Sequence, residues 1–276
     1  MRTGVKLFVG VGLVCLWLLL TISGIIQFPE IGGIIKDMAH LTKSSDKINW
    51  KTVNLYSIDL PESAKEAKNN VVISQNTVKV MDVKVFYREA KPPDSVTATG
   101  QSVLLLHGRS FSSETWEKIE TLRLLAALGY RVIAVDLPGY GNTHDKLTGD
   151  RGEFLLSLLQ ALDLLKSRPV VVSPSMSGEY SVTFLKEHSS KLAGYIPVAP
   201  VATNSVPPSV LEKIQVPTLI VYGSEDNTGL AEAALKNLKV MPNSREVKLE
   251  QAGHPAYLNQ PDVFHKLVYN FMLLLK

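Results

Sequence analysis

The pattern of apolar and polar residues divides the 276-residue chain into four parts. A short polar tail, residues 1–6, precedes an uncharged apolar segment over residues 7–28. Residues 29–70 mix charged, small and apolar side chains without a sustained period, which is typical of a tether. From residue 71 to residue 276, segments with strand and helix periods alternate. The sequence therefore predicts a membrane-spanning helix, a tether and one globular domain.

The globular part begins with Thr77–Tyr87, where apolar and polar residues alternate around Met81 and Asp82. This alternation predicts a half-exposed antiparallel hairpin. Continuous apolar runs follow, separated by helical periods, as in strands buried on both faces of a mostly parallel sheet. We expect strands over residues 102–106, 131–135, 170–172, 195–198, 218–222 and 245–249, and helices over residues 113–128 and 154–165 and from Pro261 onward. The expected fold is α/β, with a mixed sheet covered by helices on both faces.

The apolar segment over residues 7–28 is long enough to cross a bilayer. At a rise of about 1.5 Å per residue it extends roughly 33 Å as a helix. A cleaved signal peptide is the alternative, because Arg2 and Lys6 resemble its basic start. The apolar stretch is longer than usual for such a peptide and continues past the small residues at Ser23 and Gly24. An uncleaved single-pass anchor is favoured, with type II orientation preferred and a cytoplasmic domain left open.

Composition excludes several classes of function. The chain has 29 Lys and Arg against 26 Asp and Glu, a formal net charge of +3, and no dense basic run, so nothing indicates nucleic-acid binding. Its single cysteine, Cys15, lies in the apolar segment, which leaves the remainder without a disulfide or a cysteine metal site. Gly139 and Gly141 lack the third glycine of a nucleotide-binding loop. We expect no metal and no organic cofactor.

Polar residues suited to acyl transfer follow the predicted strands, at the edge where open α/β sheets bind ligands. They occur in the order Ser175, Asp226, His254. A serine hydroxyl needs a base to take its proton, and an imidazole base needs a carboxylate to fix its tautomer. The oxyanion of a tetrahedral intermediate needs N–H donors, for which the amides of Met176 and Arg109 are placed. These residues predict a catalytic triad and an oxyanion hole.

The turn around Ser175 has an unusual composition. The sequence Val-Val-Val-Ser-Pro-Ser-Met-Ser-Gly places Ser173 and Ser177 two residues to either side of Ser175, where glycines usually flank such a nucleophile. Small residues are expected there because strand and helix backbones approach closely, and Gly178 adds room. A serine between a strand and a helix is more often a helix cap, and either flanking serine is a competing nucleophile. The strand end places Ser175 at the apex.

Other titratable residues compete for the remaining roles. Glu225 is a competing carboxylate beside Asp226, which we favour. His107 and His144 lie in loops at the same edge, but their positions do not fit the expected order of the triad. We expect Asp136, which precedes a Pro-Gly-Tyr-Gly turn, to be structural.

The combined motifs resemble the α/β-hydrolase superfamily over residues 71–276. The matching segments are Leu-Leu-Leu-His-Gly, Val-Asp-Leu-Pro-Gly-Tyr-Gly, the serine-centred turn, Tyr-Gly-Ser-Glu-Asp and Ala-Gly-His-Pro. The resemblance implies Ser175, Asp226 and His254 as the triad of a catalytic domain. The chain departs from the superfamily at the two flanking serines. Only residues 199–217 separate two predicted strands where many relatives insert a cap domain, so we expect an open, shallow site.

The sequence thus predicts a membrane-anchored serine hydrolase that cleaves a carboxylic ester, thioester or amide. Its partners are a small ester or acylated substrate and, through the N-terminal helix, a lipid bilayer. Two alternatives remain at this point. The first is an acyltransferase that passes the acyl group to a thiol or amine, and the second is a non-catalytic scaffold on the same fold.

Overall fold

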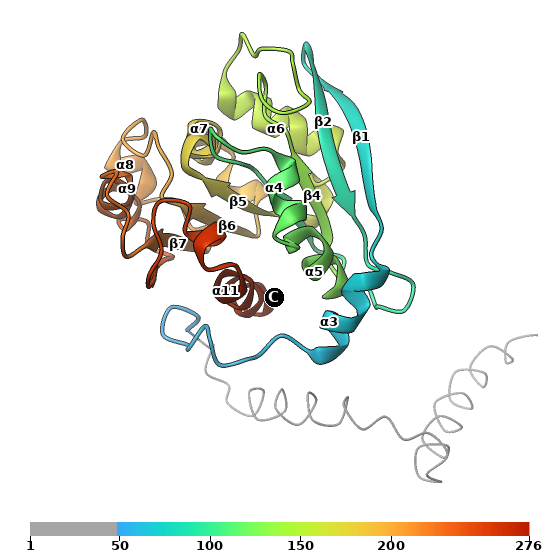
Figure 1. Ribbon diagram of the computed structural model, residues 1–276. Coiled ribbons are helices and arrows are strands. Elements are labelled where there is room, and N and C mark those ends of the chain that lie inside the picture. The colour runs from blue at the N-terminus through green and yellow to red at the C-terminus, as the bar shows by residue number, and fades with distance from the viewer. Residues whose placement is uncertain (1–48, 276) are drawn as a thin grey trace, which may run out of the picture. The chain divides into compact units, whose positions relative to one another are not determined.

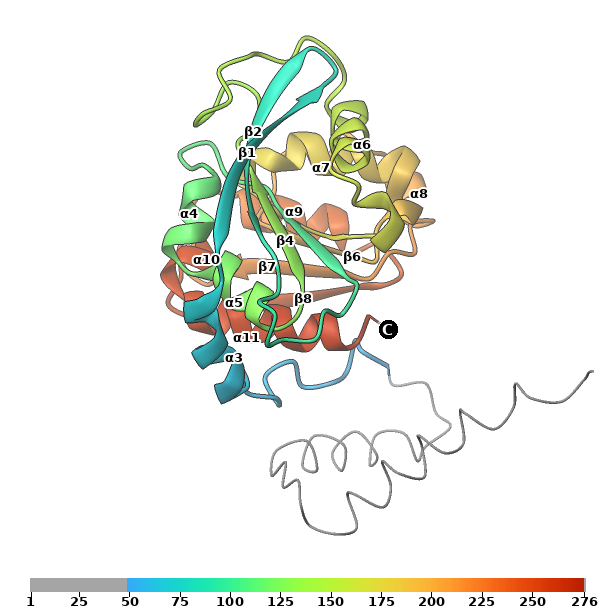
Figure 2. The ribbon, with the colours of Figure 1, turned by 90° about the vertical axis from the view of Figure 1, so that its right-hand side faces the viewer.

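An eight-stranded mixed sheet runs through residues 49–275, the part of the chain that the computed structural model describes (Figures 1 and 2). The strand order is β1-β2-β4-β3-β5-β6-β7-β8. The strands are β1 (Ile73–Val80), β2 (Val83–Ala90), β3 (Ser102–Leu105), β4 (Arg131–Val135), β5 (Val170–Pro174), β6 (Gly194–Val198), β7 (Thr218–Gly223) and β8 (Ser244–Leu249). The α-helices are α3 (Glu62–Ala67), α4 (Ser113–Lys118), α5 (Thr121–Ala127), α6 (Arg151–Ala161), α7 (Gly178–His188), α8 (Pro208–Leu211), α9 (Leu230–Leu238), α10 (Ala256–Asn259) and α11 (Pro261–Leu273). Short 3-10 helices are η1 (Lys68–Asn70), η2 (Leu165–Ser167), η3 (Ser175–Ser177) and η4 (Ser189–Lys191).

The sheet is antiparallel only at its β1 edge, as the sequence predicts. β1 and β2 form a hairpin in which Val80 pairs with Val83, and Met81 makes the turn with a positive φ of 51°. β2 also runs antiparallel to β4. The remaining neighbours, from β4 to β8, pair in parallel. The carboxyl ends of these parallel strands therefore meet at one edge of the sheet.

Helices cover both faces of the sheet, and a separate apolar core fills each side. Figure 2 shows α4, α5 and α11 on one face and α6, α7 and α8 on the other. Successive residues of a strand point to opposite faces. Val170 and Val172 accordingly join the core beneath α5 and α11, and Val171 joins the core beneath α6 and α7. Burial on both faces explains why these strands are apolar without alternation.

Two helices differ from their predicted bounds. The helix expected over residues 113–128 is broken into α4 and α5 at Glu120, which has a φ of 62°. The helix expected over residues 154–165 is α6, which begins earlier because the side chain of Asp150 caps it by accepting from the N–H of Glu153. Apolar periodicity marks the buried face of a helix, whereas caps and turns set its ends.

The globular unit begins at Trp50, earlier than the expected boundary at residue 71. The Trp50 ring packs edge-on against Phe271 with ring centroids 5.2 Å apart, and its Nε1–H donates to Asn243 Oδ1 at 2.7 Å. Leu55 is fully buried, and α3 follows. Residues 50–70 thus belong to the domain. The packing of Trp50 on Phe271 joins this segment to the far end of the chain, so no local period marks it.

The predicted membrane span over residues 7–28 lies outside the described residues. Within residues 49–275, no helix combines the length and apolar character needed to cross a bilayer.

Candidate active site

Ser175 stands in a strained turn between β5 and α7. Its φ is 50°, in the left-handed region that residues other than glycine rarely adopt, and such strain concentrates at functional sites. The Ser175 carbonyl accepts from the N–H of Val201 at 2.9 Å. A Cβ on Gly178 would lie 2.3 Å from the Val201 oxygen, so the close backbone approach that requires glycine occurs at 178. The Cβ atoms of Ser173 and Ser177 fit at the positions where glycines usually stand.

The structure brings His254 and Asp226 to Ser175. Ser175 Oγ lies 2.8 Å from His254 Nε2, and His254 Nδ1 lies 2.8 Å from Asp226 Oδ2. A carboxylate only accepts, so Nδ1 carries the imidazole proton and Nε2 is free to accept from the serine. Three residues from the ends of β5, β7 and β8 thus form one continuous hydrogen-bonded chain.

Thr228 completes the environment of Asp226, and the sequence reasoning missed it. The Asp226 side chain is fully buried, and its Oδ1 accepts from Thr228 N–H at 2.9 Å and from Thr228 Oγ–H at 2.6 Å. Burial raises the pKa of Asp226, but the hydrogen bonds from Thr228 and His254 outweigh it and hold the pKa below its usual value. The Asp-Asn-Thr spacing, typical of a turn closed by an aspartate side chain, was the available signal. Glu225 is exposed, and its N–H donates to Ala252 O instead.

The loop that carries His254 is held against the end of β7. A Cβ on Gly223 would lie 2.1 Å from the Ala252 oxygen, so the strand end and the loop backbone are in close contact. The N–H of Gly253 donates to Asn259 Oδ1 at 2.9 Å. These contacts fix the backbone that leads into His254.

His107 is buried and has a structural role. Its Nδ1–H donates to Gly108 O at 2.9 Å, and its Nε2 accepts from the N–H of Leu137 at 2.9 Å. Burial lowers the pKa of His107, so the ring stays neutral at pH 7. Asp136 is also buried, and its carboxylate accepts from the backbone N–H of Ser113 at the start of α4 and from that of Asn142. His144 lies exposed on the surface.

The two amides expected to form an oxyanion hole belong to peptides with anchored carbonyls. The Gly108 carbonyl accepts from His107 Nδ1–H and from Phe111 N–H, at 2.9 and 3.0 Å. The Ser175 carbonyl is held by Val201, as described above. In a trans peptide the N–H points away from the carbonyl, so these bonds fix the directions of the Arg109 and Met176 N–H groups. A Cβ on Gly108 would lie 3.5 Å from Ser175 Cβ, which places this loop beside the serine.

A groove of about 610 Å³ runs along the α4 side of the site. It is lined by Arg109, Ser110, Phe111, Ser112, Glu114, Thr115, Lys118, Ile119, Tyr140 and Gly141. Between β6 and β7, the described residues 199–217 contain only the four-residue α8, so no cap domain is inserted there. The lining of the groove mixes polar and apolar side chains and carries charges of both signs.

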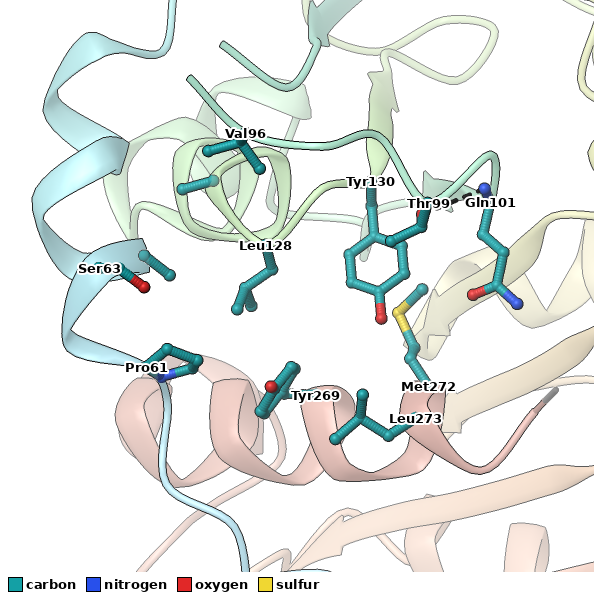
Figure 3. Close-up of a pocket in the computed structure, with 12 residues that line it drawn as sticks. Pro61, Ser63, Val96, Thr99, Gln101, Leu128, Tyr130, Tyr269, Met272 and Leu273 are labelled. Carbon is teal, nitrogen blue, oxygen red and sulfur yellow. Dashed lines mark hydrogen bonds between the residues drawn. The ribbon is translucent and has the colours of Figure 1, made fainter. Parts of the chain in front are cut away.

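A second cavity, of about 470 Å³, lies away from this site (Figure 3). Gln101 and Tyr130, which line it, immediately precede β3 and β4, so it lies at the amino edge of the sheet. Tyr269 and Leu273 of α11 close its other side in Figure 3. None of its lining residues belongs to the Ser175 site. Across residues 49–275 there is also no group of three or more His, Cys, Asp or Glu side chains that could hold a metal ion.

Known proteins are similar to this chain in sequence and in fold. The alpha/beta hydrolase family model matches residues 103–181. ABHD14B of Rattus norvegicus, named as a proposed protein-lysine deacylase, is 42% identical over 209 residues, 74% of this chain and 97% of that protein. The chain belongs to the α/β-hydrolase family. ABHD14A of Danio rerio is 44% identical over 201 residues, covering 69% of this chain and 72% of the relative. This chain is therefore similar to both ABHD14A and ABHD14B.

Solved structures show the same fold. A predicted CIB-like hydrolase from Thermoplasma acidophilum superposes with a TM-score of 0.65 at 26% identity, over 73% of this chain and 98% of that one. A serine hydrolase involved in carbazole degradation gives a TM-score of 0.61 at 20% identity, over 74% and 100%, which shows the fold alone. The matches to hydrolases confirm the expected α/β-hydrolase fold and support a hydrolase role.

Proposed function

We propose that this α/β-hydrolase family member is a serine hydrolase that works through an acyl-enzyme on Ser175. The observation that carries the proposal is the continuous chain from Ser175 Oγ through His254 to the buried Asp226 carboxylate. This chain supplies the three functions that a weak hydroxyl nucleophile needs, namely a base, a fixed tautomer and a counter-charge.

The proposed reaction has two halves. His254 Nε2 takes the Ser175 proton as Oγ attacks the acyl carbon, and then gives that proton to the departing alcohol, thiol or amine. Water next enters, loses a proton to Nε2 and attacks the ester carbon, and the proton returns to Ser175 as the acid leaves. Asp226 holds the imidazole and stabilises its cationic form. The Arg109 and Met176 N–H groups donate to the oxyanion in both halves, and each such donor is worth roughly 3 kcal/mol in related sites.

We further propose that the scissile bond is the amide of an acylated lysine on a polypeptide. A related ABHD14B protein is named for this activity. The supporting feature here is the groove of about 610 Å³ beside Arg109, which leaves room for a bulky carrier. The absence of a cap between β6 and β7 leaves that side open as well. The same intermediate could pass its acyl group to a thiol or amine, and this open groove is the observation that favours transfer as a second candidate.

Labelling with a fluorophosphonate probe tests the nucleophile. Wild-type protein should be labelled and Ser175→Ala should not, whereas Ser110→Ala, an exposed serine in the groove, should label normally. Persistent labelling of Ser175→Ala would rule out the assignment, and unlabelled but well-folded wild type would favour the scaffold alternative. Appearance of the unmodified lysine side chain on an acetylated peptide tests the substrate class. With a thiol acceptor present, free acetate reports hydrolysis and the acetyl thioester of the acceptor reports transfer.

We also propose that residues 7–28 anchor the domain to a membrane, with type II orientation. The support is the length and uncharged character of the segment. The full chain should stay in the membrane pellet after carbonate extraction, whereas a chain beginning at Asn49 should not. Protease protection of the full chain in sealed vesicles identifies the side on which the domain lies.

A further inference from the structure

Four buried hydroxyl groups form a hydrogen-bonded chain beneath Ser175. They belong to Tyr195 of β6, Ser181 of α7, Ser173 of β5 and Ser177 of η3. Their residues are at most 2% exposed. The oxygen–oxygen distances along the chain are 2.8 Å from Tyr195 to Ser181, 2.6 Å from Ser181 to Ser173 and 3.0 Å from Ser173 to Ser177. The chain ends at the carbonyl oxygen of Pro174, 2.8 Å from Ser177 Oγ.

The number of hydrogens fixes the direction of this chain. There are four hydroxyl hydrogens for the four hydrogen bonds, and a carbonyl can only accept. Ser177 must donate to Pro174 O, so it accepts from Ser173. Ser173 in turn accepts from Ser181, and Ser181 accepts from Tyr195. Burial raises the pKa of Tyr195 to about 12, so the first donor keeps its proton at neutral pH.

The carbonyl at the end of the chain belongs to the peptide that leads into Ser175. Hydrogen bonds therefore hold the peptides on both sides of the strained residue, through Ser177 at the Pro174 carbonyl and through Val201 at the Ser175 carbonyl. A residue with φ of 50° keeps that conformation only where its surroundings determine it. Glycines at positions 173 and 177, the usual flanking residues of such a turn, would supply no hydroxyl.

We propose that four residues, Tyr195, Ser181, Ser173 and Ser177, are positioning residues that hold the Pro174–Ser175 peptide in place. They thereby keep Ser175 Oγ within hydrogen-bonding distance of His254 Nε2. This inference rests on the proposed nucleophilic role of Ser175. It gives the two flanking serines a function of their own. Weakening this series of hydrogen bonds lets the turn relax toward ordinary φ values and moves Ser175 Oγ away from His254 Nε2.

The direction of the chain predicts a graded effect. Ser177→Ala removes the bond to Pro174 O and should lower kcat about tenfold to a hundredfold, because small misplacements of reacting groups cost that much. Ser173→Ala leaves that bond in place but removes the hydroxyl that donates to Ser177, so the loss in kcat should be smaller. Tyr195→Phe leaves the three bonds nearest Ser175 intact, and kcat should fall by about twofold only. KM should stay near the wild-type value in all three.

The measurement is kcat per reactive serine with p-nitrophenyl acetate, in protein whose Ser175 has been titrated with a fluorophosphonate probe. A purely structural role would lower the melting temperature and the titrated fraction but leave kcat per titrated site unchanged. Thr183→Ala is the matched control, because its Oγ–H donates within α7 to Glu179 O at 2.8 Å and lies outside the chain. It should keep wild-type kcat.

A double variant covers the case in which Ser177→Ala does not fold. Ser173→Gly with Ser177→Gly removes both hydroxyls and leaves Ser181 paired with Tyr195, so no buried hydroxyl is orphaned. It should fold, by near-UV circular dichroism, and show kcat per site about tenfold below wild type. If the folded single and double variants keep the wild-type kcat per site, the inference is overturned, and the proposed role of Ser175 as nucleophile still stands. Unlabelled wild type overturns the proposed function, and the inference falls with it.

Discussion

Replacing Asp226 with Asn should reverse the tautomer of His254. Both donors of Thr228, its N–H and its Oγ–H, point at Asp226 Oδ1, at 2.9 and 2.6 Å. That position must therefore hold an oxygen, and the NH₂ group of the asparagine must face His254 Nδ1. Because an NH₂ donates, Nδ1 must accept and the proton moves to Nε2. Nε2 can then no longer take the proton of Ser175.

The expected loss is large in activity and small in stability. The same carboxylate-to-amide change in the serine protease triad lowers kcat about ten-thousandfold through the wrong tautomer. We expect a thousandfold to ten-thousandfold loss in kcat/KM, which is about 4 to 5.5 kcal/mol of transition-state stabilisation. The Thr228 bonds remain, so the fold should persist. Because the pKa of Asp226 is lowered in the folded state, its charge stabilises wild type above about pH 4, and this contribution is lost as the pH falls through the folded pKa.

The assay is kcat/KM for p-nitrophenyl acetate together with the second-order rate of fluorophosphonate labelling. Glu225→Gln is the matched control, an exposed carboxylate on the neighbouring residue, and it should stay within about twofold of wild type. If the Asp226→Asn variant keeps more than a tenth of the wild-type kcat/KM, Thr228 does not turn the asparagine NH₂ group toward His254.

Three further changes test the packing and the protonation of the domain. Gly178→Ala should cost about 1–3 kcal/mol of stability and lower activity, because its Cβ would lie 2.3 Å from a backbone oxygen, whereas Gly149→Ala meets only a flexible side chain and should be mild. Burial lowers the pKa of His265 to about 4, so wild-type unfolding free energy should fall by up to about 3 kcal/mol between pH 6.5 and 4, and His265→Gln should flatten that slope in urea titrations. A chain beginning at Val71 should melt well below one beginning at Asn49, and equal melting temperatures would show that residues 50–70 add nothing.

Strand positions were predictable because burial on both faces leaves a direct trace in the sequence. The apolar run Val170–Val172 and the alternation in Thr77–Tyr87 each indicate their own environment. Helix ends were less predictable, since the break at Glu120 depends on a left-handed residue and not on the apolar pattern. The packing of Trp50 on Phe271 left no local signal, because the partner is far along the chain.

Sequence alone determined the fold class and the order Ser175, Asp226, His254, since strand ends are local features and parallel strands bring their carboxyl ends to one edge. Only the tertiary structure decided how those groups are held. Thr228 reaches Asp226 through a turn. Tyr195 of β6 bonds to Ser181 of α7, which bonds in turn to Ser173 of the neighbouring strand β5. Hydrogen bonds depend on atoms placed within a few tenths of an ångström, and that placement comes from packing between segments distant in the chain.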